Sequence, residues 1–123
     1  MKIFHTLEVQ IRQILDRFYA RWPQAVPDKD RLHHCKIISH RGDYDNRNVF
    51  ENTMNAFDRA KDQGVWGIEF DLRWTKDLNP VAIHDADLRR VFGLDFSIQT
   101  VTLAELKSRC PLVPSLAEMI QRY

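Results

Sequence analysis

Histidine, arginine and paired acidic residues stand at three places in the chain where predicted strands end. His40 and Arg41 follow a short apolar run, Glu69 and Asp71 lie two residues apart in an alternating stretch, and His84 closes another apolar run. Side chains two apart on a strand point to the same face. In a parallel α/β sheet, ligands bind beyond the carboxyl ends of the strands. We therefore expect these side chains to meet at one rim.

These residue types together favour hydrolysis of a phosphate ester. Two carboxylates such as Glu69 and Asp71 cannot both stay ionised cheaply in a cleft unless a cation lies between them. Oxygen ligands select hard ions such as Mg²⁺ or Ca²⁺. Two imidazoles can act as general base and general acid near neutral pH, and an arginine fork suits the oxygens of a phosphate.

Each of these residues also has an ordinary structural interpretation. Glu69 and Asp71 could be the exposed face of an antiparallel strand, and His84 could be a buried imidazole bonded to a carbonyl. Asp85 could cap the following turn, and Arg41 could belong only to a tight turn with the glycine after it. The position of every one of them at or near a strand end favours the functional interpretation.

The elements that would position these residues alternate between strand and helix from residue 36 onward. Apolar runs or alternation predict strands at residues 37–40, 65–75 and 80–85, and Glu51 to Gln63 has a helical pattern with Asn52 or Thr53 as N-cap and Gly64 just past its end. Capping-box patterns at Thr102 and Ser115 predict two further helices. Strands separated by helices indicate βαβ units and a parallel sheet.

The first 36 residues have a different pattern. Ile3 to Trp22 carries an apolar stripe with helical spacing and ends before Pro23. The stripe could rest on a membrane surface, but packing under a larger core is the favoured interpretation. The connection that follows is polar, and we expect the adjacent His33 and His34 to be solvent-facing loop residues. The predicted organisation is therefore residues 1–36, a helix and connection, followed by a domain at 37–123.

Composition excludes several classes of protein. The net charge of +1 in 123 residues gives no basic field for nucleic acid. Charged residues interrupt every apolar stretch near the start, so neither a signal peptide nor a membrane span is predicted, and we expect a cytoplasmic protein. Cys35 and Cys110 lie far apart and form no CxxC pair, which favours reduced thiols.

The order of short motifs along the chain resembles the glycerophosphodiester phosphodiesterase family. The motifs are His40-Arg41-Gly42, Glu51-Asn52-Thr53, Gly67-Ile68-Glu69-Phe70-Asp71, Thr75-Lys76-Asp77, Pro80-Val81 and His84-Asp85. Each motif alone is a weak signal, whereas the ordered set is specific. The resemblance implies an α/β fold, the first three strands of a TIM-type (β/α) barrel preceded by the amphipathic helix.

The resemblance also implies a reaction and a set of roles. The reaction is hydrolysis of a small-molecule glycerophosphodiester to an alcohol and glycerol 3-phosphate with a divalent metal, Mg²⁺ or Ca²⁺. The implied site has an acid/base pair, a phosphate ligand and two metal ligands, which are His40 with His84, Arg41, and Glu69 with Asp71. Glu51 and Asp85 are implied to orient these residues.

The family supplies a third carboxylate, with a nearby lysine, from a strand after the helix that begins near Leu116, and the chain stops at Tyr123. We therefore expect a fragment with little activity alone, which would need a completing chain or an oligomer. Two alternatives remain: a non-catalytic remnant that binds phosphate or metal, and a phospholipase of the sphingomyelinase D type. The Glu51-Asn52-Thr53 and Thr75-Lys76-Asp77 segments favour the phosphodiesterase over this phospholipase.

Overall fold

The computed structural model describes residues 11, 14–23 and 25–123, and the chain divides into two compact units, 1–35 and 36–123. In the first unit, residues 14–21 are helical and the helix stops before Pro23. Most of the rest of the predicted segment Ile3–Trp22 lies outside the described residues. The loop predicted around His33 is wrong, because a short helix α2, Lys29–His33, forms where the Asp28 side chain accepts a hydrogen bond from the Arg31 amide at 2.8 Å.

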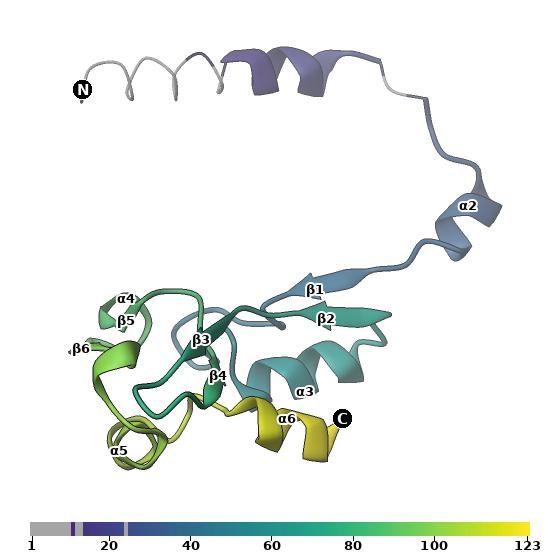
Figure 1. Cartoon of the computed structure of the whole chain (residues 1–123). Coiled ribbons are helices and arrows are strands. Elements are labelled where there is room, and N and C mark those ends of the chain that lie inside the picture. The colour runs from purple at the N-terminus through teal and green to yellow at the C-terminus, as the bar shows by residue number, and fades with distance from the viewer. Residues whose placement is uncertain (1–10, 12–13, 24) are drawn as a thin grey trace. The chain divides into compact units, whose positions relative to one another are not determined.

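The second unit mixes short strands and helices (Figure 1). Its elements in order are β1 Ile38–His40, α3 Met54–Asp62, β2 Gly67–Glu69, β3 Leu72–Trp74, β4 Pro80–Ala82, β5 Asp87–Leu88, α4 Arg89–Phe92, β6 Leu94–Ser97, the 3-10 helix η1 Ile98–Thr100, α5 Leu103–Arg109 and α6 Leu116–Arg122. β1 and β2 pair in parallel, as predicted. β3 pairs with β4, and β5 with β6, both antiparallel.

The single strand predicted over residues 65–75 is wrong, because the chain leaves β2 after Glu69 and begins β3 at Leu72. The Thr75 hydroxyl binds both Asp77 and the Asn79 carbonyl, which closes a tight turn after β3. Strands joined by such a turn can pair only antiparallel, so β4 is not the parallel neighbour of β3 that the sequence pattern suggested. Leu72 and Trp74 of β3 are 41% and 55% exposed.

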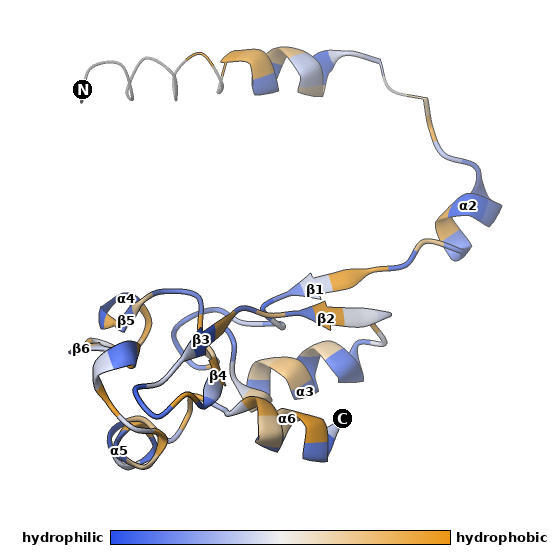
Figure 2. Cartoon of the chain, in the orientation of Figure 1, coloured by the Kyte–Doolittle hydropathy of each residue, from blue (hydrophilic) through white to orange (hydrophobic). Residues whose placement is uncertain are grey.

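The core lies on both faces of β4 and the residue that follows it. Val81 and Ile83 are buried in a cluster with β5, η1 and α5, whereas Ala82 is buried with Phe57 of α3 and Met119 of α6. Successive strand residues point to opposite faces, so one strand serves both clusters. Figure 2 shows that α3 and α6 each carry both hydrophobic and hydrophilic residues.

Local signals explain where the helices begin. Thr53 caps α3 through the Ala56 amide, so this helix starts three residues later than the predicted Glu51. The capping boxes predicted at Thr102 and Ser115 are confirmed at the starts of α5 and α6. A bidentate ion pair from Arg122 to Asp58 then joins α6 to α3.

Two further features concern the cysteines and the length of the helices. Both cysteines are free, and burial raises the pKa of the Cys110 thiol. Among residues 11, 14–23 and 25–123, every helix is too short or too polar to traverse a bilayer.

The turn after β1 depends on a glycine that lies against α3. Gly42 has φ +87°, and a Cβ placed on it would lie 2.7 Å from the carbonyl carbon of Ala56. We expect Gly42→Ala to lower the free energy of unfolding by about 3 kcal/mol, because left-handed strain and overpacking add. Urea denaturation measures this loss.

Gly64 provides the matched control for this prediction. It also has a positive φ, +75°, but an added Cβ would meet nothing within 4 Å. Gly64→Ala should therefore cost only about 1 kcal/mol. Equal losses at the two glycines would contradict a role for the close approach to α3.

Candidate active site

The parallel register of β1 and β2 places His40 beside Glu69, since these residues are direct partners at the carboxyl ends of the two strands. His40 Nε2 lies 3.8 Å from Glu69 Oε2, and the two side chains are 65% and 48% exposed. The imidazole and the carboxylate therefore face solvent together and remain accessible to a ligand.

Arg41 is held in a strained turn directly after β1. Its φ is +62°, a conformation that costs a non-glycine residue about 1–2 kcal/mol. Its amide donates to the Glu69 carbonyl at 2.9 Å and its carbonyl accepts from the Asn52 amide at 3.0 Å. These bonds direct the guanidinium toward two carboxylates, Glu51 at 3.0 Å and Asp71 at 3.1 Å.

The end of β4 brings His84 to the same region. The Ile83 amide donates to the Asp71 carbonyl at 3.0 Å, which joins this strand end to the segment just after β2. Arg73 donates twice to the His84 carbonyl, at 2.9 and 2.8 Å, and so holds the backbone of the histidine. The periodicity of the sequence contains no signal for this contact.

The tautomer of the His84 imidazole follows from its neighbour Asp85, whose Oδ1 lies 2.6 Å from His84 Nδ1. Hydrogen bonds from Arg90 and then His84 lower the pKa of Asp85 to about 2, so this carboxylate is ionised and can only accept. Nδ1 must therefore carry the proton of the neutral imidazole. Nε2 is left with a lone pair that can take up a proton.

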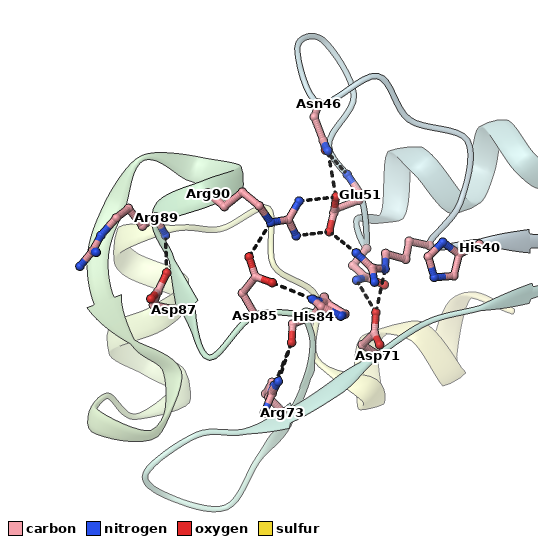
Figure 3. A network of polar contacts seen from close by, with 12 residues as sticks. His40, Asn46, Glu51, Asp71, Arg73, His84, Asp85, Asp87, Arg89 and Arg90 are labelled. Atoms are coloured by element: carbon pink, nitrogen blue, oxygen red, sulfur yellow. Dashed lines mark hydrogen bonds and ion pairs between the residues drawn. The ribbon is translucent and has the colours of Figure 1, made fainter. Parts of the chain in front are cut away.

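Glu51 connects the two halves of the site. Its side chain is 3% exposed and accepts from Arg90 at 2.6 and 3.0 Å, from Arg41 at 3.0 Å and from Asn46 at 2.8 Å (Figure 3). Arg90, with help from Asn46 and Arg41, lowers the pKa of Glu51 to about 2. Three donors thus hold this buried charge.

An uninterrupted series of polar contacts runs across the site (Figure 3). In order, its members are Asp71, Arg41, Glu51, Arg90, Asp85 and His84. The structure therefore links six side chains, which come from the ends of β1, β2 and β4, from the segment before α3 and from α4. Within the described part of the chain, no direct hydrogen bond or ion pair joins His84 to Glu69 or Asp71.

The polar atoms near Asp71 fit a ligand that offers both an acceptor oxygen and a cation or hydroxyl. Arg41 Nε and Asn52 Oδ1 are buried without a hydrogen-bond partner, although Arg41 Nε lies 3.1 Å from Asp71 Oδ2. A bound group could supply both partners, a phosphate oxygen for the N–H and a cation or hydroxyl for the amide oxygen. Glu69 and Asp71 add two hard oxygen donors. In the described part of the chain, no three His, Cys, Asp or Glu side chains form a group able to hold a metal.

The buried Glu51 carboxylate predicts a pH-dependent contribution to stability. Its pKa falls from 4.5 to about 2 on folding, so its contribution is complete above pH 4.5 and is lost as the pH falls toward 2. At pH 6, Glu51→Gln should lower the free energy of unfolding by about 3 kcal/mol. This difference from the unsubstituted chain should shrink between pH 4.5 and pH 2.

Asp95 supplies the control, since it pairs with Arg89 and is 78% exposed. Asp95→Asn should cost less than about 1 kcal/mol. Chemical denaturation at several pH values measures both variants. A Glu51→Gln difference that stays constant with pH would contradict the assignment of a buried charge.

Comparison with known proteins identifies the family of this chain. The sequence profile of the glycerophosphoryl diester phosphodiesterase family matches residues 40–122, which is more than half of the chain. A glycerophosphodiester phosphodiesterase of Caldanaerobacter subterraneus is 44% identical over 71 residues, a match that covers 58% of this chain and 28% of the relative.

Solved structures agree with the sequence match. The glycerophosphodiester phosphodiesterase of Thermotoga maritima superposes with a TM-score of 0.66 at 39% identity, over 74% of this chain and 40% of that one. A phosphodiesterase of Oleispira antarctica, solved with the product sn-glycerol-3-phosphate, gives a TM-score of 0.58 at 30% identity, over 71% of this chain and 39% of that one. The chain thus spans less than half the length of these relatives. On the profile match and these likenesses together, it belongs to the glycerophosphoryl diester phosphodiesterase family.

Proposed function

We propose that these residues serve the metal-dependent hydrolysis of a glycerophosphodiester to an alcohol and glycerol 3-phosphate. The observation that carries the proposal is the meeting of His40 with Glu69, Arg41 with Asp71, and His84 with Asp85 at neighbouring strand ends. Family membership supports the substrate class, and the Oleispira relative was solved with the corresponding product. We further propose that β1, β2 and β4 belong to a (β/α) barrel of the TIM type.

Arg41 binds the phosphate in this proposal. Its side chain is 15% exposed and already anchored by Glu51, so little side-chain entropy is lost when it donates to a phosphate oxygen. Asp71 and Asn52 flank it, and Asn52 donates to Asp71 Oδ2 at 3.3 Å. The strained turn that holds the Arg41 guanidinium near these polar groups supports this proposed role.

Glu69 and Asp71 are the proposed metal ligands. Their side chains are 48% and 28% exposed, so both retain access to a cation and its waters. A bound Mg²⁺ or Ca²⁺ would supply positive charge that stabilises the phosphoryl oxygens. The half-exposed Glu69 is the freer of the two acids, because Asp71 is already shared with Arg41 and Asn52.

The two imidazoles supply the two proton transfers that ester cleavage requires. One must take the proton from the attacking hydroxyl, and the other must give a proton to the leaving alcohol oxygen. His84 presents its free Nε2 because Asp85 holds Nδ1, whereas His40 stands next to the carboxylate of Glu69. Each histidine therefore lies beside a carboxylate.

Metal binding can be measured without turnover. Isothermal titration of the chain with Mg²⁺ or Ca²⁺ should show binding that Asp71→Asn and Glu69→Gln each weaken tenfold or more, that is, by about 1.4 kcal/mol or more. Asp62, an exposed acid at the end of α3, is the control, and Asp62→Asn should leave the affinity unchanged. Equal affinity in all variants would overturn the assignment of the ligands.

Hydrolysis of glycerophosphocholine with Mg²⁺ or Ca²⁺, measured on the chain together with its completing part, tests the reaction itself. His40→Ala and His84→Ala should each lower the rate about 100-fold or more, while His34→Ala, an exposed histidine of the first unit, should not. Turnover that persists in both variants would contradict the proposed acid/base pair.

Two other outcomes would assign a different function. Metal and phosphate binding without turnover would indicate a non-catalytic binding role. Faster cleavage of sphingomyelin than of glycerophosphocholine would indicate a phospholipase of the sphingomyelinase D type.

A further inference from the structure

Arg90 lies in α4, outside the motifs that resemble the family, yet it contacts two acidic residues of the site, Asp85 and Glu51. Its Nε donates to Asp85 Oδ2 at 2.6 Å. Its two terminal nitrogens donate to the two oxygens of Glu51, at 2.6 and 3.0 Å. One planar guanidinium thus holds two carboxylates at once, a geometry that the point charge of lysine cannot reproduce.

The contact with Asp85 restricts the carboxylate that faces His84. Asp85 Oδ1 accepts from His84 Nδ1 and Oδ2 accepts from Arg90, so each oxygen is engaged by a different partner (Figure 3). Without the second contact, the 24% exposed carboxylate could rotate toward water. The orientation of the imidazole therefore depends on a residue that does not contact it.

The contact with Glu51 ties the same guanidinium to the other half of the site. Glu51 also accepts from Arg41 at 3.0 Å. A shift of Arg90 would therefore disturb Asp85 and Glu51 together, and through them His84 and Arg41. The neighbouring Arg89 makes no such link, because it pairs with the exposed Asp95.

We propose that Arg90 is a positioning residue, which holds His84 in the Nδ1–H tautomer through Asp85 and aligns Arg41 through Glu51. The use of that tautomer in proton transfer rests on the proposed function. The arrangement itself does not, since it can be observed in the chain without substrate. A neutral histidine free in water favours the Nε2–H tautomer, so the effect of Arg90 has a direct spectroscopic signature.

Two-bond ¹H–¹⁵N correlation spectra of the imidazoles, recorded near pH 9 where histidine is neutral, report the tautomer. The signal is assigned with His84→Gln. In the unsubstituted chain we expect Nδ1–H at His84. In Arg90→Met the ratio of Nδ1–H to Nε2–H should fall about tenfold or more, which corresponds to the loss of one charge-assisted hydrogen bond.

Arg89→Met is the matched control, because it removes the same charge from the same helix. It should leave the His84 tautomer as in the unsubstituted chain. If Arg90→Met fails to fold, Arg90→Lys tests the same point. Its ammonium keeps the charge but cannot serve Asp85 and Glu51 together, so the Nδ1–H share should be lower than in the unsubstituted chain.

An unchanged tautomer in a folded Arg90 variant would overturn the proposal, as would an equal change in Arg89→Met. These outcomes do not depend on whether the proposed hydrolase function is correct. A chain that shows the expected tautomer but, together with its completing part, does not cleave glycerophosphocholine would refute the proposed function alone. Where cleavage is observed, Arg90→Met should lower kcat about tenfold and Arg90→Lys should restore part of it, with Arg89→Met unaffected.

Discussion

The candidate site depends on a single buried carboxylate, that of Glu51. Removing an ionised carboxylate from water costs several kcal/mol unless cations and hydrogen bonds replace the lost hydration. Here Arg90, Arg41 and Asn46 provide them, and the side chain is only 3% exposed. The need to satisfy this one charge fixes where both guanidinium groups lie. Each of them then fixes a second acid, Asp71 for Arg41 and Asp85 for Arg90.

Backbone strain accumulates next to this charge. Arg41, Gly42 and Asn52 all have positive φ values, and the two non-glycine residues cost free energy in that conformation. The loop that contains them is held against α3, since the Asp43 amide donates to the Ala56 carbonyl at 2.9 Å. The packing of α3 therefore stabilises the strained conformation that directs Arg41 toward the acids.

The other half of the site depends on the core in a similar way. Val81, Ala82 and Ile83 are buried against two separate clusters, and His84 follows them directly. A side chain at the end of a strand that is packed on both faces has little freedom to move. The position of His84 is thus set by the same contacts that stabilise the second unit, and a change in either cluster would be transmitted to the imidazole.

The amino-acid sequence by itself determined the local features of this protein. Thr53, Thr102 and Ser115 cap helices because their hydroxyls bind amides within three residues, and the ordered motifs from His40 to His84 identify the family because each is a short contiguous pattern. The placing of Glu51 and Asp85 beside the predicted site residues also followed from those motifs.

Only the tertiary structure decided which distant residues meet. No periodicity or spacing rule connects Arg90 with Glu51, 39 positions earlier, or Arg73 with the His84 carbonyl. The break after Glu69 has no signal in the sequence either, since the alternation of apolar and polar residues continues through residue 74. Contacts between residues far apart in sequence depend on how the chain packs around its core, and a local sequence pattern does not predict them.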